Sequence, residues 1–159
     1  HDLNIWNSFV FYLKNEKYVV KDLANIFQEL KDFLELNGYS VNWLGTKTED
    51  SVDYPDMALA AAKEFKKGNY DFGVVCCGTG IGISIAVNKI KGLRCALVGD
   101  SFSAKMAKEH NNCQFIAFGG RIDYRESIES MLDAFADAVP SPEVRHQSRV
   151  AKLMALEKE

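Results

Sequence analysis

The stretch that decides the fold is Val75-Cys76-Cys77-Gly78-Thr79-Gly80-Ile81-Gly82-Ile83-Ser84, where a short apolar run breaks into closely spaced glycines before an apolar continuation. Such a run predicts a buried strand that turns sharply into a helix. Glycines tolerate positive φ and let a ligand approach the backbone closely. The first N–H groups of the helix have no helical partner and favour an anion or a developing oxyanion. We therefore expect a ligand at this loop, the alternative being a tight turn with none.

Two well-known glycine loops do not match this stretch. A P-loop needs Gly-Lys-Ser/Thr at its end, but Gly82 is followed by Ile83. A dinucleotide fingerprint has G-x-G-x-x-G after the first strand, whereas Ile83 stands where its third glycine belongs and the loop follows the third predicted strand. Asp100, near the end of the next strand, resembles a ribose-binding acid, so nucleotide binding stays open as an alternative.

Outward from the loop, apolar β-branched runs alternate with segments of helical period, which is typical of parallel βαβ units. The predicted strands are 8–13, 40–44, 72–76, 94–98 and 114–118. The predicted helices are 21–36, 55–67, the glycine loop to about 91, 100 or 101 to about 111, 125–138, and 142–157 beyond the sheet. With no internal repeat or linker, we expect one α/β domain over residues 1–159, a three-layer αβα sandwich.

Composition excludes several functional classes. Lys and Arg total 19 against 22 Asp and Glu, so no basic excess indicates nucleic acid. Apolar runs such as 72–77 are far shorter than a membrane span. The four cysteines show no C-x-x-C spacing and there are only three histidines, so we expect no metal. Cysteines in apolar runs favour reduced thiols and a cytoplasmic protein.

Three positions outside the glycines carry possible chemistry. Cys77 stands at the mouth of the loop, where the positive end of a helix macrodipole favours a thiolate; the alternative is a buried apolar cysteine. His110 falls in a last helical turn, where it is by itself more simply a solvated cation. Arg145 and Arg149 are one turn apart on one helix face, an arrangement suited to gripping a phosphate unless both are surface charges.

From about Gly38 to the C-terminus the chain resembles the ribose-5-phosphate isomerase type B family, with the related galactose-6-phosphate isomerase subunits. The matching segments are Ser51-Val52-Asp53-Tyr54-Pro55, the C-G-T-G-I-G-x-S-I-A-x-N-K run of residues 77–89, Glu109-His110-Asn111, Gly119-Gly120-Arg121, and Arg145-His146-Gln147 with Arg149 and Val150.

The resemblance implies a Rossmann-like sheet of five parallel strands in the order 2-1-3-4-5. It also implies a homodimer, or a tetramer built from dimers, with active sites between subunits. The reaction would be aldose–ketose isomerisation of a phosphorylated pentose or hexose, and we expect no cofactor and no metal.

The same resemblance implies roles for individual residues. Cys77 would remove the proton beside the carbonyl, and His110 would assist ring opening. The ene-diolate oxygen would be stabilised by Thr79 and by the backbone of Gly78, Gly80, Ile81 and Gly82. The remaining matched residues would hold the phosphate (Arg121, Arg145, Arg149) or line the pocket (Tyr54, Asn111).

One segment departs from the family pattern. Members carry an Asp-His pair just after the first strand, but this chain has Val20-Lys21 or Lys14-Asn15 there, depending on the alignment. A catalytically degenerate member is therefore the alternative: a sugar-phosphate or nucleotide binding module, or a non-catalytic subunit.

Overall fold

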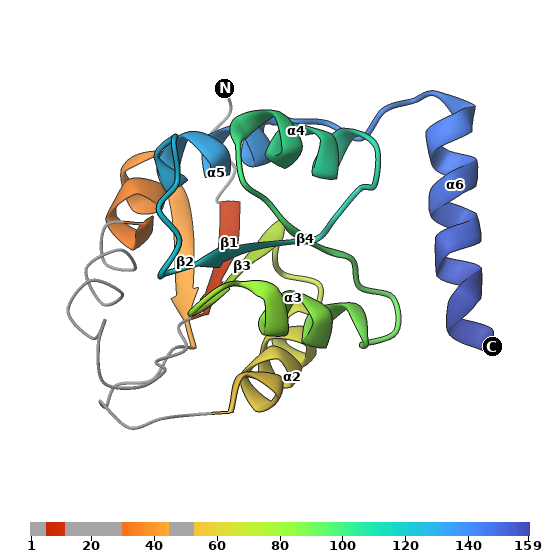
Figure 1. Cartoon of the computed structure of the whole chain (residues 1–159), viewed down its shortest axis with the longest axis horizontal. Helices are drawn as coiled ribbons and strands as arrows, with labels where there is room; N and C mark the ends of the chain where they lie inside the picture. Colours follow the sequence, from red (N-terminus) through yellow and green to blue (C-terminus); the bar gives the residue numbers. More distant parts are fainter. Residues whose placement is uncertain (1–5, 12–29, 45–52) are drawn as a thin grey trace.

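A parallel sheet forms the centre of the molecule. The computed structural model describes residues 6–11, 30–44 and 53–159. Within them the strands are β1 (Trp6–Phe11), β2 (Tyr39–Trp43), β3 (Phe72–Cys77), β4 (Cys95–Leu97) and β5 (Phe115–Gly119), and every pairing is parallel (Figure 1). The predicted α/β class with a parallel sheet is confirmed.

The expected strand order is wrong in its last two positions. The sheet runs β2-β1-β3-β5-β4, so β5 lies beside β3 and β4 forms the edge. Parallel strands covered on both faces need apolar residues on both. All five residues of β5 are buried, whereas β4 has three residues and its Leu97 is 43% exposed. The longer strand, buried along its whole length, therefore takes the inner position.

Helices cover both faces of this sheet. They are a helical segment over 30–36, α2 (Tyr54–Phe65), α3 (Ile81–Asn88), α4 (Ser101–Glu109), α5 (Ile128–Asp137) and α6 (Val144–Ala155), followed by the short 3₁₀ helix η1 (Leu156–Lys158). The predicted start of α5 at Arg125 is three residues early, because the Ser127 hydroxyl accepts a bond from the N–H of Ser130 and caps the helix. The first part of the predicted helix 21–36 lies outside the described residues.

Alternating side chains of the inner strands supply two separate cores. Phe115 and Ala117 face α2 and α3, where they join Val75 and Ile83. Phe118 belongs to the other core, which is formed with α4, α5 and the 30–36 helix. Neighbouring strand residues point to opposite faces, so Cys77 belongs to the first core and Cys76 to the second.

The exposed edge of the sheet at β4 is covered by one side chain. The amide of Asn88, at the end of α3, accepts a hydrogen bond from the N–H of Cys95 at 2.9 Å and donates to its carbonyl at 2.8 Å. These are the backbone groups that a neighbouring strand would otherwise use.

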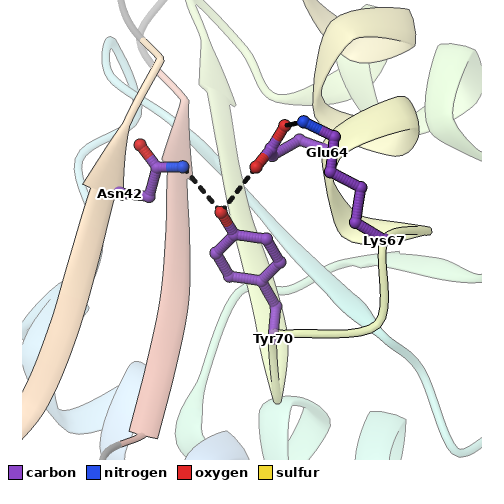
Figure 2. A network of polar contacts seen from close by, with 4 residues as sticks. All are labelled: Asn42, Glu64, Lys67 and Tyr70. Carbon is purple, nitrogen blue, oxygen red and sulfur yellow. Dashed lines mark hydrogen bonds and ion pairs between the residues drawn. The ribbon is translucent and has the colours of Figure 1, made fainter.

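The opposite edge of the sheet is tied to α2 by a polar network (Figure 2). The Tyr70 hydroxyl accepts from Asn42 on β2 at 2.6 Å and donates to Glu64 on α2 at 2.8 Å. Glu64 is also paired with Lys67. Hydrogen bonds from Lys67 and Tyr70 lower the pKa of Glu64. The network fixes β2 against the end of α2.

The last helix, α6, stands beside the body of the molecule at the end of an extended segment (Figure 1). His146 is its one buried residue, while Leu153 and Leu156 are 45% and 61% exposed. Its apolar side is thus largely uncovered in a single chain. No helix within residues 30–44 and 53–159 has the length and apolar character needed to cross a bilayer.

The β3–β5 contact yields a first prediction. A Cβ on Gly73 would lie 2.3 Å from Cε1 of the fully buried Phe115 ring. We expect Gly73→Ala to lower the free energy of unfolding by about 1–3 kcal/mol, because the packed ring has no room to move. Urea denaturation measures the change.

Gly99→Ala is the matched control. A Cβ there meets no atom within 4 Å, so we expect a change within about 0.5 kcal/mol. Equal losses in the two variants would show that the contact between Gly73 and Phe115 does not limit packing.

Candidate functional site

The glycine loop forms the strand-to-helix turn that the sequence predicts. β3 ends at Cys77, and α3 begins at Ile81. Gly80 caps α3 with φ +77°, and a Cβ on it would lie 2.6 Å from Leu97 Cδ1 and 2.8 Å from the carbonyl carbon of Phe118. Both the backbone conformation and the space therefore require glycine here.

This loop is bonded to the segment that follows β5. The N–H of Gly120 donates to the Cys77 carbonyl and that of Arg121 to the Gly78 carbonyl, both at 2.9 Å. A Cβ on Gly119 would lie 2.6 Å from the carbonyl of Thr79. The two loops thus form one rigid unit at the carboxyl end of the sheet.

Cys77 is the thiol that belongs to this unit. Its Sγ accepts a hydrogen bond from the N–H of Gly80 at 3.2 Å, and the residue is 7% exposed. An N–H donor at the start of a helix stabilises negative charge on sulfur. Burial raises the pKa of Cys76, Cys95 and Cys113, the last to about 11, so these three remain neutral thiols at physiological pH.

Two further predicted site residues lie against the loop. A Cβ on Gly78 would come within 3.4 Å of the Arg121 guanidinium, and one on Gly82 within 2.6 Å of Tyr54 Cζ. Thr79 is exposed between them, and its hydroxyl accepts from the N–H of Ile81 at 3.3 Å. A cation, a phenol, a hydroxyl and a thiol therefore meet at one end of β3. We call this group, made of Cys77, Thr79, Arg121 and Tyr54 with the loop backbone, the thiol cluster.

The other predicted site residues lie at the opposite end of the sheet. α4 begins after the carboxyl end of β4 and brings His110 and Asn111 back to the strands' amino ends, where the Asn111 carbonyl accepts from Arg94. β5 alone, Phe115–Gly119, spans roughly 13 Å between these levels. Within one chain, His110 therefore does not join the thiol cluster.

His110 instead contacts α6. Its ring stacks on that of His146, with centroids 4.0 Å apart and planes 8° from parallel. Burial, followed by the neighbouring His110, lowers the pKa of His146. A cavity of about 400 Å³ lies beside the stack, between the end of α4 and α6. The sequence reasoning missed His146, although it stands in the matched Arg145-His146-Gln147 segment.

Arg145 and Arg149 lie on α6 on either side of His146 in the sequence, and both are exposed. Arg145 is paired with Glu143, and this pairing lowers the pKa of that carboxyl. We call His110, Asn111, Arg145 and Arg149 the arm cluster. It offers cations and an imidazole but no thiol.

Both alternative positions of the Asp-His pair, Lys14-Asn15 and Val20-Lys21, lie outside the described residues. Across the part of the chain that is described, no three His, Cys, Asp or Glu side chains gather into a group that could hold a metal.

Comparison with known proteins gives consistent matches. The family described as Ribose/Galactose Isomerase matches residues 15–153. Ribose-5-phosphate isomerase B of Escherichia coli is 36% identical over 129 residues, covering 81% of this chain and 86% of that protein. The galactose-6-phosphate isomerase subunit LacB of Clostridium acetobutylicum is 40% identical over 125 residues, covering 79% and 72%.

A solved structure agrees over nearly the whole length. Ribose-5-phosphate isomerase B of Clostridium thermocellum superposes with a TM-score of 0.84 at 36% identity, covering 96% of this chain and 97% of that one. The sequence matches and the shared fold lead to one conclusion: the chain belongs to the ribose/galactose isomerase family and is an isomerase.

Proposed function

We propose that this isomerase interconverts ribose 5-phosphate and ribulose 5-phosphate, with Cys77 as the base. The observation that carries the proposal is the position of the Cys77 sulfur at the start of α3, 3.2 Å from the N–H of Gly80. Relatives named as ribose-5-phosphate isomerase B, such as the Escherichia coli and Clostridium thermocellum proteins, support the choice of substrate.

The proton transfer requires a base and a stabilised oxygen. The Cys77 thiolate takes the proton from C2 of the open-chain aldose. The C2–H electrons form a C1–C2 double bond, and the π electrons of the C1 carbonyl move to O1, which gives an ene-diolate. The thiol then returns a proton to C1, while the hydroxyl proton moves from O2 to O1, giving the ketose. Thr79 stabilises the developing negative charge on oxygen, together with those backbone N–H groups of 78–82 that do not donate to the Cys77 sulfur or the Thr79 hydroxyl.

The arm cluster assists ring opening and binds the phosphate. His110 assists opening of the furanose, and Arg145 and Arg149 hold the phosphate together with Arg121 of the thiol cluster. Charge-assisted bonds from planar guanidinium groups suit a phosphate. Asn111 and Tyr54 line the pocket.

A second copy of the chain completes each site in this proposal. The two clusters lie at opposite ends of one sheet, so a partner must bring its arm cluster to the first chain's thiol cluster. The uncovered Leu153 of α6 and Leu156 of η1 give such a partner an apolar surface to bury. A homodimer with two shared sites follows.

The base assignment predicts the behaviour of Cys77→Ala. We expect kcat for ribose 5-phosphate to fall by about 10²–10⁴-fold, because the variant keeps the loop but loses the base. A coupled assay that follows conversion to ribulose 5-phosphate measures kcat. Cys76→Ala is the control, since the adjacent thiol belongs to the other core and stays protonated. Retained turnover in Cys77→Ala refutes the assignment.

Thiol reactivity gives a further prediction. At pH 8 a thiol with a pKa near 11, such as Cys113, is ionised in roughly one molecule in a thousand. We expect iodoacetamide to label Cys77 first in the native protein, and ribose 5-phosphate to slow the reaction. Peptide mass spectrometry locates the label. Because Cys76 and Cys77 lie in one peptide, the Cys76→Ala variant shows whether Cys77 carries it. Preferential labelling of Cys95 or Cys113 contradicts the proposal.

The shared site predicts complementation between inactive variants. Mixing Cys77→Ala with the double variant Arg145→Ala/Arg149→Ala, under conditions of subunit exchange, leaves one intact site in each mixed dimer. With equal amounts of the two variants, half of the dimers are mixed, so we expect about a quarter of wild-type activity.

The control mixes Cys77→Ala with Thr79→Ala, which are both in the thiol cluster. Every site in those mixed dimers carries a lesion, so activity stays low. If the first mixture also gains nothing, although native mass spectrometry shows that mixed dimers have formed, each site lies within one chain.

A further inference from the structure

Arg94 joins three segments at the amino end of the sheet. It lies directly before β4 and is half-buried. Its Nε donates to the Asn111 carbonyl and its Nη2 to the Asn112 carbonyl, both at 2.8 Å. Its Nη1 donates to the Met154 sulfur on α6 at 3.1 Å. All three guanidinium nitrogens therefore bond to protein atoms.

The turn that Arg94 holds has an unusual backbone. Asn112 has φ +43°, the one positive φ of a non-glycine residue in the described parts of the chain. The turn directly follows His110 at the end of α4. The Asn111 and Asn112 carbonyls therefore have no partner within the helix. A planar fork donating to two successive carbonyls fixes both the turn and the end of the helix that carries His110.

The same side chain fixes the far end of α6. Among the described residues, the contacts that attach this helix and η1 to the body include the His146–His110 stack, the Arg94–Met154 bond, and a bond from the Gly92 N–H to Glu157 at 2.8 Å. Arg149 lies between the first two contacts in sequence. Its place relative to His110 is therefore set by the stack on one side and by Arg94 on the other.

We infer that Arg94 is a positioning residue for the arm cluster: it holds the His110 turn and α6 in one arrangement without touching the substrate. This rests on the proposed function, in which Arg145 and Arg149 bind the phosphate. By charge alone Arg94 would count as another phosphate ligand, but its bonds to Asn111, Asn112 and Met154 assign it to the scaffold.

The test compares Arg94→Lys and Arg94→Ala with the wild-type protein in isothermal titrations with inorganic phosphate. We expect both variants to bind phosphate about fivefold to twentyfold more weakly, because one ammonium cannot bridge two carbonyls and a sulfur. In kinetic assays the KM for ribose 5-phosphate should rise by a larger factor than kcat falls, since phosphate contacts serve substrate and transition state alike.

Two control variants separate the positioning role of Arg94 from a general loss of stability and from the loss of a positive charge. Gln114→Leu removes bonds to the Arg94 N–H and the Gly92 carbonyl but leaves the guanidinium contacts intact. Lys89→Met removes a nearby exposed positive charge. We expect both to keep phosphate affinity within twofold of wild type, even where Gln114→Leu lowers the melting temperature.

Several outcomes overturn the inference. These are unchanged phosphate affinity in both Arg94 variants, wild-type affinity in Arg94→Lys, or an equal loss in Gln114→Leu. If Arg94→Ala does not fold, Arg94→Lys decides alone. A wild-type protein that binds phosphate but does not turn over ribose 5-phosphate defeats the proposed function and leaves this test standing; one that binds no phosphate defeats the inference as well.

Discussion

The pairing of β3 with β5 is the constraint on which the rest of the structure depends. Gly73 leaves room for the Phe115 ring at one end of the pair, and Cys77 lies opposite Gly119 at the other. Between these ends, alternating side chains of the two strands fill the cores on both faces of the sheet. The bonds from Gly120 and Arg121 extend the pairing into the loops, so the backbone of the thiol cluster is fixed to the sheet.

Local signals in the sequence predict local structure well. The glycine spacing after Cys77 predicts the strand, loop and helix that are observed, because Gly80 combines a positive φ with a crowded Cβ position and Gly82 lies against Tyr54. The strand order is a different kind of property. Whether β4 or β5 lies beside β3 depends on which strand can be covered on both faces, and that comparison involves helices distant in sequence.

The candidate site shows the same difference between what local motifs predict and what depends on contacts between distant segments. The residues of the thiol cluster come from segments that the sheet brings together, and the matched motifs identify them. Their separation from the arm cluster was not visible in the motifs, because it follows from the direction in which α4 returns along the sheet. The roles of His146 and Arg94 in attaching α6 depend on contacts between segments about 36 and 60 residues apart, and neither residue type signals such contacts alone.

The Asn88 side chain at the sheet edge limits how two molecules can associate. An uncovered edge strand invites another strand to add to it, which leads to open-ended growth of the sheet. Because Asn88 already occupies the N–H and carbonyl of Cys95, a three-residue strand retains too few outward groups to hold an incoming backbone. Self-association through this edge is thereby disfavoured. An assembly that uses this edge must be held by side chains, whose shape and charge restrict the number of copies, so the sheet is protected from fibre formation on that side.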